Sequence, residues 1–554
     1  MDRRSALVLL VVFGTGVFLA GLELMVTAVA LPSILADLVD PNGTSAWVEL
    51  RKASWIINGY LLVYILAMPL AGRLADLWGV RRLFIGALVV FVLGSLAAGA
   101  AQDLDQLIAA RLVQAVGGGV LVPVGTAAAA HLYAGAARSR ALGVVGALTF
   151  LGMATGPVVG AAVLSGIHPE AALASQGALA HIAAPAWRWV FYLNVPIGIA
   201  AIALAWAASA GWETPRHEGR LDVLGALLFG LALAGGLIAL TLVGSASIGE
   251  TGLDPATVTL VLAAISLAAT IVAILRATRT RDPFLDVRLF RRGAFASAAV
   301  VSLLTGYAFA TAIIGAAVFV DRVLYGGPDD QRLALGALAG ATAVGALASG
   351  FLVRIASYRV ITLAGLALSV LGLGLMARWA ATTPIGTVAL TLAIFGLGFG
   401  STVTPRSSAA IEAAGRRAFG AASSVVTVAR MLGMAVGLAI LTAYGSTTID
   451  RLSAQIYATP EGYLALIPAE LRNRPLRDPL VVEALETWAS REAASIMVGL
   501  FVAATVTAVA AIPAALALGG ASGRRRTVGA EPGSIDGDPR MLARDGPPDV
   551  DFVL

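Results

Sequence analysis

The sequence predicts an all-α integral membrane protein with fourteen transmembrane helices, and three observations lead to this prediction. Of the 554 residues, 58% are hydrophobic and 13% are charged, and the mean hydropathy is +0.86, whereas soluble proteins are ~25% charged. Apolar stretches long enough to cross a bilayer, ~20 residues, recur along the chain. The loops between them alternate in arginine content, as the topology of a multi-span protein requires.

The predicted spans share this length and apolar composition and cover about residues 6–31, 54–76, 82–101, 106–131, 140–165, 188–209, 221–244, 255–276, 294–320, 333–354, 358–379, 385–408, 420–445 and 493–518. The start of the first span, with Arg3, Arg4 and Ala28-Val29-Ala30, has features of a secretory signal. Its apolar run is too long for one and contains Glu23. We therefore expect a retained first span.

Alternate loops differ in charge, which predicts the orientation. The basic set comprises Arg3/Arg4, Arg81/Arg82, Arg138/Arg140, Arg216/Arg220, Arg276 to Arg292, Arg354/Arg359, Arg416/Arg417 and Arg524 to Arg526. The other set is poorer in arginine or also carries acids, as at Asp103/Asp105 and Glu250/Asp254. The positive-inside rule then predicts that both termini are cytoplasmic, in the inner membrane of a bacterial cell.

Composition excludes several functional classes. The chain has no cysteine and four scattered histidines, so it offers no thiol chemistry and no metal-ligand spacing. Lys52 is the only lysine, and no Walker A loop is present to cradle a nucleotide. Paired carboxylates or a nucleophile with a base are also missing. We expect no enzyme activity, no cofactor, no metal and no nucleic-acid partner, and we expect a monomer.

The segment between the second and third spans, 72–82, reads GRLADLWGVRR. Gly72 and Gly79 permit a tight turn and close helix approach. Asp76 stands at a helix end, where it is placed to pair with Arg73, Arg81 or Arg82. This loop resembles the signature of the major facilitator superfamily. The resemblance implies a latch between conformations, formed by Gly72, Arg73, Asp76, Gly79 and Arg81.

Residues 350–359, GFLVRIASYR, are a degraded copy of this loop. Gly350 aligns with Gly72 and Arg359 with Arg81, while Arg354 falls where Asp76 stands. Transporters built from two similar halves show such repeats. We therefore expect a major facilitator fold: a six-helix bundle over 1–210, two linker helices over 211–282, and a second six-helix bundle over 283–518.

Further segments resemble the fourteen-span drug:proton antiporter family. They are LELMVTAVALP at 22–32, RLVQAVGGG at 111–119, GMATGPVVGA at 152–161, WRWVFYLNVPIG at 187–198 and PFLDVRLF at 283–290. That family usually has Asp where Glu23 stands. The likeness covers about residues 6–445 and implies proton-driven transport.

Glu23 and Arg111 are charges inside predicted spans, where they are costly and usually face a cavity or a partner. Both fall in the outer half of the membrane, so they share a depth. Low dielectric favours a neutral carboxyl, and a nearby guanidinium favours the carboxylate. If the two groups approach in only one conformation, proton affinity becomes coupled to shape. A static structural pair, or a carboxylate that binds a cationic substrate, is the alternative.

Other intramembrane residues have packing or binding roles in this scheme. Gly152, Gly156 and Gly160 form one small-residue face, and Pro157 permits a kink. They fit either a hinge between the halves or a packing face. Tyr60, Gln114, Tyr307 and Arg430 stand inside spans and are candidates to line a substrate cavity, Arg430 by pairing with an acid or an anionic headgroup.

Two segments depart from the pattern of short loops. Residues 446–490 form a long outer segment with helical spacing at Ile449, Leu452 and Ile456, which predicts a helical hairpin that extends the last two spans. An ordinary loop is the alternative. The tail, 519–554, is rich in Gly, Pro, Arg and Asp, and is predicted to be disordered and cytoplasmic.

These expectations together predict a proton-coupled exporter of amphipathic or hydrophobic compounds of the multidrug type. The alternative is an exporter of lipids such as triacylglycerol, because YLLVYILAMPLAGRLAD at 60–76 looks like the same stretch of mycobacterial lipid exporters. Such a protein would take lipid sideways from the bilayer and shield it with the outer hairpin. A sensor on a transporter scaffold is a third possibility, and it predicts no proton-linked flux.

Overall fold

The computed structural model describes residues 3–39, 53, 55–167, 184–214, 216, 221–242, 254–281, 283–415, 418–457, 464, 466–475 and 477–518. Within these ranges, fourteen helical spans are long and apolar enough to cross a membrane, which confirms the predicted number. The predicted tail, 519–554, lies outside the described residues.

The helices are α1 (Arg3–Leu38), α3 (Trp55–Trp78), α4 (Val80–Ala100), α5 (Leu104–Leu132), α6 (Gly135–Gly166), α9 (Trp187–Tyr192), α10 (Asn194–Ala208), α11 (Val223–Leu242), α12 (Pro255–Arg279), η2 (Val287–Arg291), α13 (Gly293–Arg322), α14 (Pro328–Leu352), α15 (Tyr358–Met376), α16 (Ile385–Ala414), α17 (Phe419–Tyr457), η5 (Ala469–Leu471) and α18 (Pro479–Leu516).

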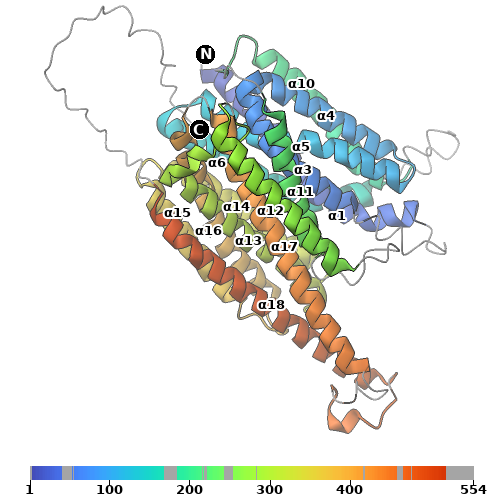
Figure 1. Cartoon of the computed structure of the whole chain (residues 1–554). Coiled ribbons are helices and arrows are strands. Elements are labelled where there is room, and N and C mark those ends of the chain that lie inside the picture. The colour runs from blue at the N-terminus through green and yellow to red at the C-terminus, as the bar shows by residue number, and fades with distance from the viewer. Residues whose placement is uncertain are drawn as a thin grey trace, which may run out of the picture.

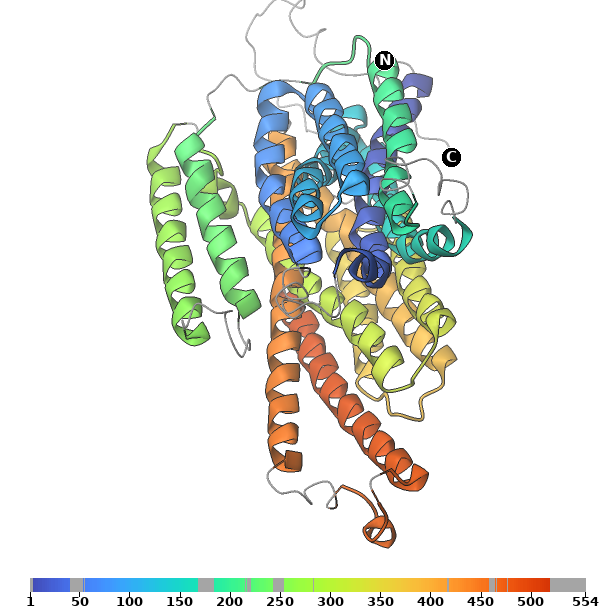
Figure 2. The same cartoon turned by 90° about the vertical axis from the view of Figure 1, so that its right-hand side faces the viewer.

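The spans form two bundles with two further helices beside them (Figure 1). In the N-terminal half, α6 packs on α1, and α5 packs on α3 and α4. In the C-terminal half, α16 packs on α14 and α15, and α13 packs on α17 and α18. Figure 2 shows α11 and α12 as a pair that stands beside the bundles, and they make their main contact with each other. This is the predicted major facilitator architecture.

The two linker helices are tied together where α11 begins and α12 ends. The Asp222 carboxylate accepts a hydrogen bond from the Gly225 amide (3.0 Å), which caps α11 as an acid at a helix N-terminus should. It also pairs with Arg276 of α12 at 2.8 Å. Burial opposes ionisation of Asp222, but the bonds from Arg276 and from the amides of Gly225 and Phe284 outweigh it and lower its pKa.

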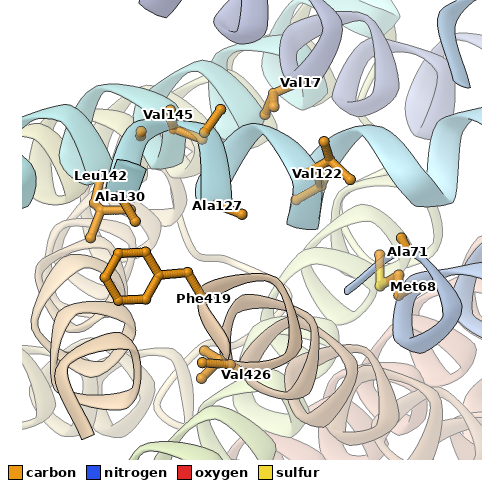
Figure 3. Packing of buried hydrophobic residues seen from close by; sticks show 14 of the residues in the cluster. Val17, Met68, Ala71, Val122, Ala127, Ala130, Leu142, Val145, Phe419 and Val426 are labelled. Atoms are coloured by element: carbon orange, nitrogen blue, oxygen red, sulfur yellow. The ribbon is translucent and has the colours of Figure 1, made fainter. Parts of the chain in front are cut away.

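The halves meet at one end of the molecule, where α1 begins, α3 ends and α17 begins, which we call the α1 end. The most extensive contacts between the halves join α3 to α17 and α6 to α14. Figure 3 shows Phe419 and Val426 of α17 packed beneath Leu142 and Ala130 of the N-terminal half. One buried apolar cluster thus includes residues of both halves at this end.

The repeated glycines make these two contacts possible. A Cβ on Gly72 would lie 2.6 Å from the Gly420 carbonyl oxygen of α17. A Cβ on Gly350 would lie 2.9 Å from the Ser139 carbonyl oxygen of α6. Both distances are shorter than real Cβ contacts, so larger residues would separate the helices. Gly79 has a different role, because its φ of 88° reverses the chain between α3 and α4.

The helices α17 and α18 are the longest of the described chain, with 39 and 38 residues. At 1.5 Å per residue each is about 57 Å long, whereas a hydrocarbon core is ~30 Å thick. Figure 2 shows both running past the other helices at the end opposite to the α1 end. The sequence-predicted helical extension of these two spans is therefore present, with part of its turn, 458–463, outside the described residues.

Candidate functional site

The centre of the candidate site is Glu23, in the middle of α1. Its side chain is 0% exposed. Close packing of α1 on α6 holds it there: a Cβ on Gly156 would lie 2.9 Å from the Leu22 carbonyl oxygen, and a Cβ on Gly160 would lie 3.3 Å from Val26. The predicted small-residue face therefore packs within the N-terminal half, against the helix that carries Glu23. Pro157 lies inside the continuous helix α6.

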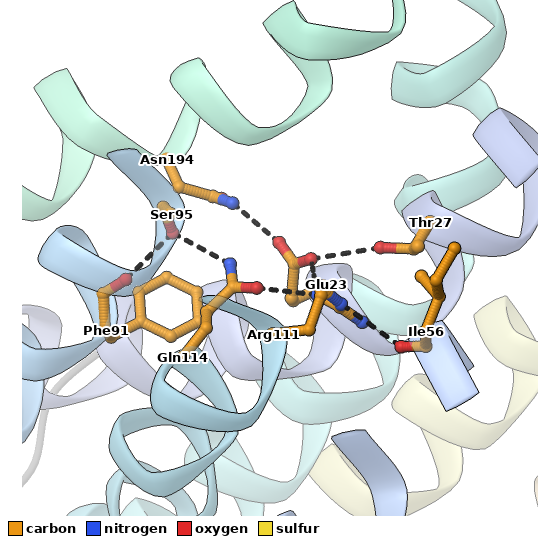
Figure 4. A network of polar contacts seen from close by, with 8 residues as sticks. All are labelled: Glu23, Thr27, Ile56, Phe91, Ser95, Arg111, Gln114 and Asn194. Carbon is orange, nitrogen blue, oxygen red and sulfur yellow. Dashed lines mark hydrogen bonds and ion pairs between the residues drawn. The ribbon is translucent and has the colours of Figure 1, made fainter. Parts of the chain in front are cut away.

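Three donors surround the Glu23 carboxylate (Figure 4). Arg111 of α5 donates from Nη1 to Oε1 and forms a buried ion pair. Thr27, one turn along α1, donates to the same oxygen at 3.0 Å. Asn194, the first residue of α10, donates from Nδ2 to Oε2 at 2.6 Å. The depth argument that brought Glu23 and Arg111 together is confirmed in its geometry.

Several further contacts fix the position of the Arg111 side chain. Its Nη1 also donates to Oε1 of Gln114 (2.6 Å), and its Nε donates to the Ile56 carbonyl (3.3 Å). Its guanidinium lies over the ring of Tyr60, 3.9 Å from the ring centroid. Five helices thus fix one buried charge pair, because Gln114 in turn donates to Ser95 of α4 at 2.8 Å.

The hydrogen-bond donors around Glu23 indicate which protonation state of its carboxyl group this geometry stabilises. A carboxylate is acceptor-only, and Glu23 meets three donors, so the site is complete with Glu23 ionised. A protonated Glu23 would need an acceptor. Oδ1 of Asn194 is buried and has no hydrogen-bond partner among the described residues. A half-turn of the Asn194 amide would bring that oxygen to the carboxyl group, so one residue can serve both states.

The predicted latch residue Asp76 reaches across to the C-terminal half. Its carboxylate accepts hydrogen bonds from the backbone amides of Gly420 and Ala421, each at 2.9 Å. These amides belong to the first turn of α17, where backbone N–H groups have no partner within the helix. A negative charge is favoured at such a helix N-terminus. Asp76 therefore joins the two halves at the α1 end.

The arginines of the predicted latch do not pair with Asp76 as the sequence led us to expect. None of the ion pairs in the described part of the chain joins Asp76 to an arginine. Arg73 attracts Asp76 through space, and its buried Nε has no acceptor among the described residues. Arg81 donates to the Trp206 carbonyl at 3.3 Å. The free amides of α17 offer Asp76 two aligned donors, which explains the difference.

The four predicted cavity residues do not form one group. Gln114 and Tyr60 belong to the Arg111 surroundings in the N-terminal half. Tyr307 of α13 is buried in an apolar cluster that is mostly C-terminal but also includes Phe150 and Met153 of α6. Arg430 of α17 is 7% exposed, with its guanidinium over the Phe150 ring at 5.5 Å. The Arg430 side chain thus contacts a residue of the opposite half.

Sequence reasoning missed three residues of these surroundings: Asn194, Thr27 and Arg406. Arg406 of α16 is 1% exposed and donates to Thr305 of α13. A signal was available for two of them, because a charge at 406 and an amide at 194 both fall inside predicted spans. The described residues contain no group of three or more His, Cys, Asp or Glu placed to hold a metal.

Comparison with known proteins agrees with this architecture. A sequence model of the Major Facilitator Superfamily matches residues 13–438. A triacylglyceride transporter of Mycolicibacterium hassiacum is 31% identical over 458 residues, 81% of each chain. Multidrug resistance protein 3 of Bacillus subtilis is 27% identical over 349 residues, 62% of this chain and 61% of its own. The solved structure of the proton:xylose symporter XylE bound to 6-bromo-6-deoxy-D-glucose covers 94% of this chain and 98% of its own, with a TM-score of 0.57 and 12% identity, which bears on the fold alone.

Proposed function

The chain belongs to the Major Facilitator Superfamily, and from this premise we propose that it is a proton-coupled exporter of amphipathic or hydrophobic compounds. The observation that carries the proposal is the Glu23–Arg111 pair, a fully buried carboxylate with a guanidinium partner inside a transmembrane bundle. Ionisable groups at such depth are expensive and mark proton or substrate pathways. In this proposal the protein lies in a bacterial inner membrane with the α1 end toward the cytoplasm.

Proton coupling follows from the two sets of partners that Glu23 can have. In the present geometry Arg111, Thr27 and Asn194 all stabilise the carboxylate. A rearrangement that draws Arg111 away would leave a carboxylate in low dielectric, which favours uptake of a proton. Asn194 then turns its free Oδ1 to accept from the carboxyl group. Proton binding is thereby linked to the conformation of the half, as an antiporter requires.

The α1 end supplies the second part of the mechanism. Asp76 on α17, Ser423 on the Pro123 carbonyl (2.8 Å) and Ser139 beside Ser408 (3.3 Å) hold the halves together there. In the proposal this is the state closed to the cytoplasm. Release of Asp76 from α17 begins the opposite state.

The experiment that tests the proposal replaces Glu23 in purified protein reconstituted into liposomes. We expect Glu23→Gln to abolish substrate-induced proton movement, whereas Glu23→Asp retains it because the carboxylate is kept. Glu412→Gln is the control, since Glu412 accepts from Tyr358 (2.7 Å) near the end of α16 and away from this network. Proton movement in Glu23→Gln equal to that of the unaltered protein would refute proton coupling at this site.

One observation favours lipid export as a second candidate function. The extension of α18 carries exposed apolar side chains, with Leu480 46% and Val482 41% exposed. Exposed apolar groups beyond the bilayer suit contact with a lipid that has left it. The triacylglyceride transporter relative is consistent with such a cargo.

Removal of the outer segment separates the two candidates. Replacing 446–490 with a short flexible linker should stop transfer of a fluorescent lipid between vesicles and leave efflux of a soluble amphipathic dye unchanged, if lipid is the cargo. Equal lipid transfer with and without the segment would exclude this role. Loss of both activities would mean that the segment is needed for the fold or the transport cycle in general.

A further inference from the structure

Two arginines of the C-terminal half are buried inside spans. Arg406 lies roughly two turns before the end of α16, and Arg430 lies roughly three turns after the start of α17. They are 1% and 7% exposed. An arginine at this depth is costly to insert into a membrane, so each needs a compensating interaction or a function.

Neither arginine has a counter-charge among the residues that the structure describes. No ion pair of the described residues includes Arg406 or Arg430. The Nε atom of each is buried without an acceptor in the described part of the protein. The charge of Arg430 acts unfavourably on that of Arg406, so the two groups are near enough to repel each other. The buried acid Glu23 is already engaged by Arg111.

The surroundings are aromatic and come from both halves. Arg406 lies over the Phe399 ring (5.3 Å) and Arg430 over the Phe150 ring (5.5 Å). The Phe150 and Phe399 rings are themselves 5.6 Å apart, edge to face. Phe309 stacks on Phe399 at 4.5 Å. Because Phe150 belongs to α6 and Phe399 to α16, the arginines stand where the two halves face each other.

A free hydroxyl group completes the set of donors. Tyr64 of α3 interacts electrostatically with Arg430, and its hydroxyl is buried without a partner among the described residues. Three polar groups with unused donors, two of them positive, thus converge beside a wall of phenylalanines. Guanidinium groups bind carboxylate and phosphate with paired hydrogen bonds.

We infer that Arg406 and Arg430 form the binding site for the anionic group, a carboxylate or phosphate, of an amphipathic substrate whose apolar part packs on the phenylalanines. This inference rests on the proposed export function and specifies its substrate class. The anion removes the repulsion between the two arginines and fills their free donors. A neutral triacylglycerol would leave both guanidiniums without a counter-charge, so the geometry favours acidic amphiphiles over neutral lipids.

The test measures binding to the full chain in nanodiscs of phosphatidylcholine, which carries no net charge. The probes are pyrene-dodecanoate and its uncharged methyl ester. We expect the unaltered protein to prefer the carboxylate, and Arg406→Gln and Arg430→Gln each to weaken carboxylate binding about 30-fold, the effect of losing one partner of a buried charge contact. Ester binding should stay within about twofold. Arg378→Gln, on an exposed arginine after α15, is the control and should change neither.

A second arm identifies the source of the anion. Displacement of pyrene-dodecanoate by phosphatidylglycerol in the nanodisc supports a lipid headgroup as the ligand, and lack of displacement supports a soluble amphiphile. Equal affinity for the carboxylate and the ester, or unchanged carboxylate affinity in both arginine variants, would overturn the inference. If those variants unfold, Arg406→Lys and Arg430→Lys keep the charge and should bind with intermediate affinity. If the arginine site is refuted, proton-coupled flux of a neutral dye should still be observed. The two proposals can therefore fail separately, because the Glu23 proposal is tested by that flux.

Discussion

The two halves of this protein treat buried charge in opposite ways. In the N-terminal half, Arg111 pairs with Glu23, and both side chains make further hydrogen bonds to their neighbours (Figure 4). In the C-terminal half, Arg406 and Arg430 are buried, and neither forms an ion pair with a carboxylate of the described residues. In the proposed function, the paired charges of the N-terminal half respond to a proton, whereas the unpaired arginines of the C-terminal half bind a ligand. The difference suggests a division of labour, with coupling in one half and recognition at the edge of the other.

Aromatic groups lie between these two regions. Tyr60 carries the Arg111 guanidinium on its ring, and it stacks on Tyr64 with the ring centroids 5.7 Å apart. Tyr64 in turn faces Arg430. Proximity alone does not establish energetic coupling. It does give a physical route by which movement of Arg111 would be felt at the arginines of the C-terminal half.

The largest expected effect concerns stability. Glu23→Gln leaves Arg111 as an unpaired buried charge and should destabilise the protein by about 3–5 kcal/mol. The double variant with Arg111→Gln should recover most of this loss. Arg430→Gln should cost little or even stabilise, since it removes repulsion. Chemical unfolding of the purified variants measures all three, and equal losses for Glu23→Gln and Arg430→Gln would contradict the contrast between the halves.

A smaller effect is expected at the α1 end. Asp76→Asn weakens two hydrogen bonds to the first turn of α17, each worth about 1.5–3 kcal/mol as a charged contact. The halves should separate there more often. Because the chain has no cysteine, a single Ser423→Cys substitution reports this opening by maleimide labelling. Labelling should rise at least about tenfold with Asp76→Asn, while Ser495→Cys, which is exposed in α18, should label equally in both backgrounds.

A substitution that gives Arg406 an acidic partner would remove the difference in buried charge between the two halves. Thr305→Asp places a carboxylate where a hydroxyl now accepts from Arg406. We expect stabilisation of about 1.5 kcal/mol, the lower range for a hydrogen bond to a charged group. The same variant should lose binding of pyrene-dodecanoate, because the site then holds its own anion. Retained binding with raised stability would show that the probe binds elsewhere.

The smallest effect tests the packing that seats Glu23. Gly156→Ala would bring a methyl group within 2.9 Å of the Leu22 carbonyl oxygen, and overpacking of this kind costs about 1–2 kcal/mol. Gly340→Ala in α14 meets no atom within 4 Å. It should be neutral or slightly stabilising, because alanine favours a helix. Thermal unfolding compares the two, and equal melting temperatures would argue against a packing role for the α6 face.

The sequence alone was sufficient for the number of spans, for their places along the chain and for the two-fold organisation. Hydropathy is a local property, so each span could be located without knowing its neighbours. Glu23 and Arg111 were identified because a charge within a span is unusual wherever the span packs, and Asp76 was identified from the signature of the loop at 72–82. The extension of the last two spans followed from helical spacing at Ile449 and Leu452.

Only the tertiary structure decided the partners. It placed Asn194 on Glu23 across 171 positions of sequence and the amides of α17 on Asp76 across 344. It turned the glycine face of α6 toward α1, and it left Arg406 and Arg430 without an acidic partner in the described part of the chain. Depth along a helix can be read from a sequence, but which side chains meet depends on how helices are rotated and packed, and that is fixed by contacts among all of them at once.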